Sequence, residues 1–160
     1  MKTLPYRRED ALRYAARWAF GRNPRYLAFD GIGGDCTNFV SQCLFAGGGV
    51  MNLQRDVGWY YRSPTDRAAA WSSVPHLRRF LLENRPVGPF ACLAPLKELV
   101  PGDVVQLGRE DGVWYHTLLV TGVGETLLVS AHSVDAHLRP LSSYRCFRAQ
   151  GLHIEGFRDW

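Results

Sequence analysis

One segment of this 160-residue chain constrains its fold most strongly, the run from Gly33 to Gly49. Apolar side chains recur there at helical spacing, at Cys36, Phe39, Val40, Cys43 and Leu44. Asp35 stands directly before them and is a good N-cap residue, and the three consecutive glycines at the end of the run stop a helix. The pattern predicts a buried helix that begins at Cys36 and has its N-cap at Asp35.

Cys36 therefore occupies the first turn of the predicted helix. Backbone N–H groups at this place carry partial positive charge, which favours a thiolate and lowers the pKa of a cysteine. Cys43 lies two turns further along, and neither Cys92 nor Cys146 has a comparable setting. A cysteine on a helix is more often a small buried hydrophobic residue. The Gly33-Gly34-Asp35 lead-in and the helix-start position favour Cys36 as a nucleophile instead.

A thiol nucleophile needs a proton acceptor, and histidine is the usual one. Of the five histidines, His76 lies in a charged helical segment, and His137 and His153 lie in a predicted loop and a terminal strand. His116 begins a strongly apolar run and His132 ends the next one. His116 is accordingly the predicted base.

The two apolar runs around Gly124 predict a β-hairpin of residues 114–123 and 126–132. A hairpin centred on Gly124 places His116 opposite His132, with Cβ atoms about 4.5–5.5 Å apart. His132 would then orient the imidazole of His116, with Asp135 or Asp103 as alternatives for this role. A shift of one residue in the register would send His132 to the other face of the sheet.

The rest of the chain predicts an α+β fold in a single domain of residues 1–160. Helical spacing marks residues 7–21 and a short helix after Ser73, whereas residues 52–73 look irregular. A strand is expected at 103–107 after the Pro101-Gly102 turn, and weaker strands at 144–148 and 153–157.

Charge, cysteine content and hydropathy indicate which binding partners and which cellular location to expect. The net charge of +4 comes from basic residues spread along the chain, and no nucleic-acid motif accompanies them, so no nucleic-acid partner is expected. The four cysteines match neither a zinc ribbon nor a disulfide framework, and no cofactor is expected. The N-terminus has no signal peptide and no apolar run is long enough for a membrane span. A complete chain would thus be a cytoplasmic monomer.

Several motifs resemble the putative amidase domain family, which belongs to the wider papain-like group with the NlpC-type and CHAP-type bacterial cell-wall peptidases. The motifs include Gly33–Leu44 around Cys36, Pro101–Gln106, Trp114–Thr117 and Ser130–Asp135. The resemblance implies a papain-like fold, in which the helix bearing the nucleophile packs on a small antiparallel sheet.

The same resemblance implies the roles of individual residues. Cys36 and His116 would be the catalytic pair and His132 the third polar residue, while Asp35 would help to hold the free amine of the substrate. The expected activity is hydrolysis of an amide bond through a thioester, with a short peptide or peptidoglycan fragment as substrate. The aromatic residues Trp59 and Trp71, with Tyr60 and Tyr61, are candidates to line the groove, although packing in the core explains them equally well.

Other functions remain open from the sequence alone. An amine in place of water would make the same site a transferase. Cys36, His116 and His132 together are a possible zinc ligand set. A non-catalytic binding module on the same fold would leave Cys36 unreactive. The backbone N–H of Cys36 is expected to bind the oxyanion, and the second donor is not identified.

Overall fold

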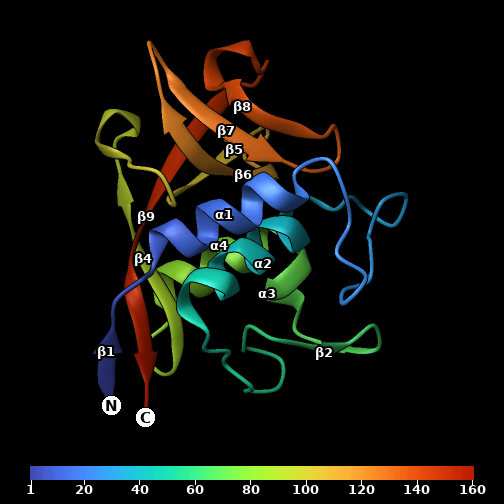
Figure 1. The fold of residues 1–160 in the computed structure, drawn as a ribbon, viewed down its shortest axis with the longest axis vertical. Helices are drawn as coiled ribbons and strands as arrows, with labels where there is room; N and C mark the ends of the chain where they lie inside the picture. Colours follow the sequence, from blue (N-terminus) through green and yellow to red (C-terminus); the bar gives the residue numbers. More distant parts are fainter.

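Seven antiparallel strands form the main sheet of the protein, as a computed structural model of residues 1–160 describes it (Figure 1). They are β1 (Lys2–Leu4), β4 (Gly88–Ala94), β5 (Val104–Gly108), β6 (Trp114–Val123), β7 (Leu127–Ala131), β8 (Ala136–Pro140) and β9 (Arg148–Asp159). The order is β1-β9-β5-β6-β7-β8, and β4 pairs with β9. Long β9 thus pairs with β1, β4 and β5, and both termini lie side by side because β1 pairs with the last residues of β9.

Helices gather on one face of this sheet, in front of β5, β6 and β9 in Figure 1. They are α1 (Arg8–Trp18), α2 (Cys36–Gly48), α3 (Ala69–Ser72) and α4 (Val74–Glu83). A small hairpin of β2 (Tyr61–Ser63) and β3 (Asp66–Arg67) leads into α3, and two 3₁₀ turns, η1 (Leu96–Glu98) and η2 (Leu141–Ser143), complete the chain. The protein is therefore α+β with an antiparallel sheet, as predicted. None of its helices has the length and hydropathy that crossing a membrane would take.

Helix α2 lies at the centre of the molecule, and all of its residues except Phe45 and Ala46 are buried. It can approach the sheet closely because Gly48 has no side chain: a Cβ there would lie 2.1 Å from the ring of Phe157. Gly49 ends the helix in the left-handed conformation, with φ of 73°. The predicted start and end of this helix are confirmed, and its burial fixes Cys36 at the edge of the main core.

Hydrophobic side chains form two clusters, one on each face of strands β5 and β6. Val104 and Leu119 join the larger cluster beneath the helices, with Phe39 of α2. Val105 and Leu118 join the smaller cluster on the opposite face. This alternation decides which side chains of β6 can reach Cys36.

The sequence predicted most elements but not all of them. The helices near residues 7–21 and after Ser73 are confirmed as α1 and α4, and the hairpin strands as β6 and β7. The prediction of a strand at 144–148 was wrong, since 144–147 lie between η2 and β9 and only Arg148 belongs to β9. The predicted strand at 153–157 is part of the longer β9. Strands β1, β4 and β8 were missed, because each is stabilised by a partner distant in the sequence or by irregular pairing.

Candidate active site

Cys36 begins helix α2 and lies at the wall of a pocket of about 390 Å³. We call this the Cys36 pocket. Its other lining residues include Phe29 and Gly34 from the segment before α2, Arg67 from β3, and Trp114 and Tyr115 from β6. The side chain is buried, with 7% of the residue exposed. A small reagent or a substrate carbonyl can therefore reach the sulfur only through this pocket.

Burial raises the pKa of the Cys36 thiol above its ordinary value. Backbone N–H groups of Thr117 and Thr37 and the Thr37 hydroxyl act in the opposite direction, since each bonds the sulfur and favours the thiolate. Burial is the largest influence, so the expectation of a lowered pKa was wrong. In the ligand-free protein the helix N-terminus does not compensate the loss of solvent around the sulfur.

A line of buried polar side chains runs from β5 to the sulfur. The Gln106 amide nitrogen lies 3.2 Å from the hydroxyl of Thr117, which lies 2.9 Å from the hydroxyl of Thr37. The Thr37 hydroxyl in turn lies 3.8 Å from the sulfur of Cys36. This line of side chains could not be predicted from the sequence, because its members belong to three elements that only β-sheet pairing and helix packing bring together.

The amide of Gln106 sets the direction of these hydrogen bonds. Its nitrogen also donates to the carbonyl oxygen of Val74 at 3.0 Å, so this end of the amide is the donor. The hydroxyl of Thr117 consequently accepts from Gln106 and donates to Thr37, since no other side-chain partner faces it. Thr37 is then free to donate to the sulfur, and this direction stabilises a thiolate at Cys36.

Replacing Gln106 by leucine should therefore raise the pKa of Cys36 further. We expect alkylation of Cys36 at a fixed pH below that pKa to slow by roughly tenfold, the worth of one lost hydrogen bond to a charged group. Thr117→Val removes the hydroxyl that bonds Thr37 and should slow alkylation of Cys36 by a similar factor. Thr117→Ser keeps the hydroxyl and should retain the alkylation rate. Gln150→Leu is the matched control, because Gln150 pairs with Gln106 across β5 and β9 but bonds Arg78. Equal rates in Gln106→Leu and Gln150→Leu would contradict the argument.

His116 does not contact Cys36 in this structure. Residues Thr117 and Leu119 face α2, so alternation along β6 turns His116 to the other face, where its ring lies 6.0 Å from that of Tyr144. Burial and the nearby charge of Arg139 lower the pKa of His116 to about 4. The imidazole is therefore neutral at pH 7, and neither ring nitrogen has a hydrogen-bond partner within the protein.

The predicted pairing of His116 with His132 was wrong. Val120 pairs with Val129 and Leu119 with Ser130, a shift of one residue from the predicted register. Near the turn Gly122 pairs with Leu128, two residues from the predicted register, and the irregularity between Val120 and Gly122 reduces this offset to one residue. His132 falls in line with Thr117 and therefore faces α2, on the side away from His116.

His132 is 2% exposed and bonds its surroundings through both ring nitrogens. Nδ1 lies 2.5 Å from a carboxylate oxygen of Asp35, and Nε2 lies 2.8 Å from the carbonyl oxygen of Trp18. The ring also stacks on Phe39, with centroids 4.1 Å apart. Nε2 also lies 3.1 Å from the guanidinium of Arg22, so both ring nitrogens have partners within the protein, and no hydrogen bond joins His132 to Cys36.

Asp35 is fully buried and binds the protein rather than solvent. One carboxylate oxygen accepts from the backbone N–H of Phe29 and from the Asn38 amide, at 2.8 and 2.9 Å. The other faces His132, and Asp35 makes no side-chain cap of the helix. Asp35 is the N-cap residue of α2, as predicted, although its carboxylate makes no cap bond. The predicted contact with a substrate amine does not fit a fully buried carboxylate.

Arg22 lies on the solvent side of the hydrogen-bond network around Asp35 and His132. Its guanidinium bonds Asp30 and Asp135 at 2.8 Å each and lies 3.6 Å from Asp35. The bond to Asp30 is the main cause that raises the pKa of Arg22 above its usual range. Asp135 is thus held by Arg22, and Asp103, the other proposed orienting acid, bonds Arg8 and His153 instead. Neither acid serves His116.

The aromatic residues predicted to line the groove lie in the core. Trp59 and Trp71 are fully buried, and their indole N–H groups donate to Ser41 and Asn38 of α2. Tyr60 and Tyr61 are also buried. The groove prediction was wrong for Trp59 and Trp71, and Trp114 and Tyr115 occupy the pocket wall in their place.

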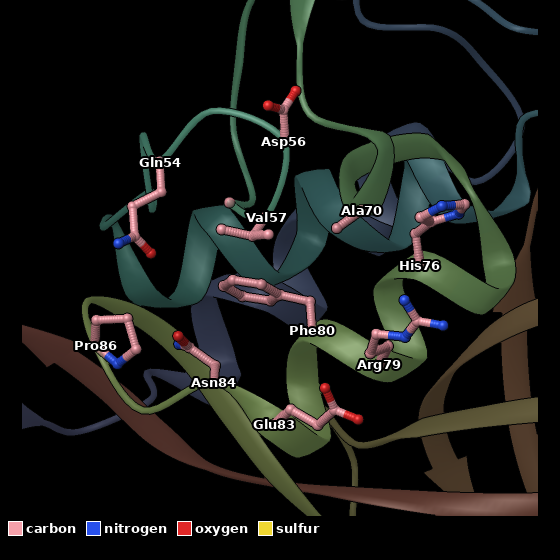
Figure 2. A pocket seen from close by; sticks show the side chains of 11 residues that line it. Gln54, Asp56, Val57, Ala70, His76, Arg79, Phe80, Glu83, Asn84 and Pro86 are labelled. Carbon is pink, nitrogen blue, oxygen red and sulfur yellow. The ribbon is translucent and has the colours of Figure 1, made fainter.

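The predicted residues form no metal centre, and Asp35 and His132 line a separate small pocket that does not include Cys36. No group of three or more His, Cys, Asp or Glu side chains is arranged to hold a metal ion, and Cys36, His116 and His132 do not converge. Figure 2 shows another pocket, of about 270 Å³, between the loop that carries Asp56 and helix α4. Its exposed side chains His76, Arg79 and Glu83 come from α4, and no cysteine lines it.

The architecture and the pocket define an α+β protein whose buried cysteine starts the central helix. The chain belongs to the family described as "Putative amidase domain", whose profile matches residues 5–154.

Among curated proteins, "Uncharacterized protein YhbB" of Bacillus subtilis (strain 168) is 35% identical over 147 residues. The matched region makes up 86% of this chain and 45% of that protein, so the chain spans less than half of the relative's length. No solved structure matches the chain significantly.

Proposed function

We propose that the protein cleaves an amide bond by nucleophilic attack of the Cys36 sulfur, through a thioester, on a papain-like fold. The observation that carries the proposal is the position of Cys36 at the start of α2, at the wall of a pocket, with hydrogen-bond donors directed at its sulfur. Such donors stabilise the charge that develops on the sulfur during attack and departure.

His116 is the proposed general base and acid. A neutral imidazole takes the proton of the Cys36 thiol while the sulfur attacks the substrate carbonyl. The resulting imidazolium gives that proton to the amine as the C–N bond breaks. Water then attacks the thioester, its proton passes to His116, and the thiol is restored when the C–S bond breaks. A raised thiol pKa and a lowered imidazole pKa fit this sequence, which starts from two neutral groups.

The edge of β6 gives His116 a route to the sulfur. Strand β7 pairs with β6 only from Leu119 onward, and the N–H of Thr117 turns to Cys36 at the unpaired edge. The Thr117 N–H belongs to the peptide bond that joins His116 to Thr117. The backbone of His116 therefore lies within a few ångströms of the sulfur. Rotation of the unbonded imidazole around this open edge brings it toward Cys36 when substrate fills the pocket.

A short peptide is the proposed class of substrate, and a peptidoglycan stem peptide is the first compound to test. The wall of the pocket combines aromatic rings of Trp114 and Tyr115 with small residues such as Gly33 and Gly34, which leaves room for a peptide backbone beside Cys36. The family membership supports an amide as the reacting group.

The pH dependence of Cys36 alkylation by iodoacetamide tests the pair. If neutral His116 assists the thiol, the rate should stay nearly constant from about pH 5 to pH 8. It should fall as the pH drops through the His116 pKa of about 4, because protonation removes the base. His116→Ala should lose this plateau, slow by at least about tenfold at pH 7, and react only as the thiolate forms at alkaline pH.

Two further variants make the result specific. Arg139→Gln removes a positive charge that lowers the His116 pKa, so the acidic fall should move to higher pH. His137→Ala removes a half-buried histidine that bonds Ser130 on β7, and should leave the profile unchanged. Identical profiles in the parent protein and His116→Ala would rule out His116 as the base.

A further inference from the structure

The charge of the Cys36 pocket bears on what it can bind. None of the twelve residues that line it is acidic, and Arg67 is its one cationic side chain. Two further guanidinium groups, those of Arg78 and Arg148, lie over the ring of the lining residue Trp114, at 4.9 and 4.3 Å from its centroid. The space beside Cys36 is therefore electropositive, and it favours anionic groups.

Arg67 is held in place without a counter-ion. Its guanidinium lies over the ring of Phe29, 4.5 Å from the centroid, and donates to the carbonyl oxygen of Pro64. No carboxylate of the protein pairs with it. The neighbouring Arg62 of the same hairpin differs, because it forms an ion pair with Asp66 at 3.0 Å. The hairpin thus neutralises its outward arginine and leaves the pocket arginine unpaired.

We propose that Arg67 binds a carboxylate of the substrate, so that the protein acts on amides that carry a free carboxylate close to the bond attacked by Cys36. The inference rests on the proposed function and names its substrate class. A guanidinium is suited to the task because its planar donors match both oxygens of a carboxylate. Stacking on Phe29 orients this plane in advance, which reduces the entropy lost on binding.

Two alkylating reagents of nearly equal size test the subsite without requiring turnover. Iodoacetate carries a carboxylate, and iodoacetamide carries a neutral amide in the same place. The rate ratio of iodoacetate to iodoacetamide is measured at Cys36 and divided by the same ratio at exposed Cys92, by mass spectrometry. We expect a normalised ratio of about 10, the factor that one charge-assisted hydrogen bond contributes. The ratio should fall as salt is added.

Variants of the hairpin assign the effect to Arg67. Arg67→Gln should lower the normalised ratio by about tenfold. Arg67→Lys keeps the charge and should retain most of the preference. Arg62→Gln removes an equal charge from the same hairpin outside the pocket, and should change nothing. A ratio near 1, or one that Arg67→Gln leaves unchanged, overturns the carboxylate subsite even if Cys36 reacts rapidly.

Equilibrium binding separates this inference from the nucleophile proposal. Should Cys36 react with neither reagent, the nucleophile proposal fails, and titration of the parent protein with N-acetylglycine and N-acetylglycinamide decides the subsite alone. Tighter binding of N-acetylglycine, reduced by about tenfold in Arg67→Gln, supports the subsite. Equal binding of the two compounds refutes it.

Discussion

Replacing Cys36 by alanine is expected to abolish acyl transfer while leaving the protein folded. The attacking sulfur has no substitute, because the nearest hydroxyl, that of Thr37, is bonded to Thr117 and is a far weaker nucleophile. Loss of a nucleophile in a covalent mechanism costs at least about 10³-fold in kcat. Hydrolysis of p-nitrophenyl acetate, an activated acyl donor, measures this loss, and mass spectrometry detects the acetylated cysteine before it is hydrolysed.

Controls separate a catalytic cysteine from a merely accessible one. Cys92 and Cys146 are both exposed, so Cys92→Ala and Cys146→Ala should retain full activity and the acetyl adduct. Cys36→Ser keeps the shape of the site and should bind substrate while turning it over very slowly. Activity in Cys36→Ala above one tenth of the parent would contradict a mechanism through Cys36 and leave a binding module as the better account.

The helix that carries Cys36 could be predicted because its signals are local. Apolar periodicity, a polar residue at the start and glycines at the end all lie within residues 33–49, and the structure places α2 at Cys36–Gly48. The β6–β7 hairpin was predicted for the same reason, from alternation around a turn. Such elements need no knowledge of distant partners.

Contacts between distant segments explain what the sequence did not reveal. The register of β6 and β7 depends on an irregularity at Thr121, and this single residue decides whether His132 faces His116 or α2. The line from Gln106 to Cys36 depends on strand β5 meeting β6 and on α2 covering both. Neither feature leaves a pattern in one stretch of sequence.

The pKa of Cys36 could not be predicted from its position at a helix start alone. A helix start favours a thiolate, and the structure supplies further N–H donors from Thr117 and Thr37. Burial opposes all of them, because removing solvent penalises the charged form more than these dipoles favour it. The thiol is therefore neutral at pH 7, and the proposed mechanism accordingly starts from a neutral base, as the lowered pKa of His116 allows.

The network around Asp35 has a structural role that directly affects this site. It joins three segments at the start of α2: the loop at Phe29, the helix through Asn38, and the end of β7 through His132. Cys36 is the next residue, so the position of its sulfur depends on this junction. Asp35 is thus placed to position the proposed nucleophile Cys36 through the backbone.

Asp35→Ala should consequently reduce the free energy of unfolding by about 3–5 kcal/mol, the cost of removing one member of a buried charged pair. The N–H of Phe29, the amide of Asn38 and the imidazole of His132 would all lose their acceptor while remaining buried. Urea unfolding followed by circular dichroism measures the change, with an expected fall in melting temperature on the order of 10 °C.

Asp30→Ala is the matched control for this loss. Asp30 bonds the same arginine, Arg22, but lies at the surface with 43% of its side chain exposed, so its removal should cost under about 1 kcal/mol. Asp35→Asn keeps the size and one acceptor oxygen, and should fall between the two. A cost in Asp35→Ala no larger than in Asp30→Ala would show that the junction does not hold α2, and that the sulfur is positioned by the core packing of the helix alone.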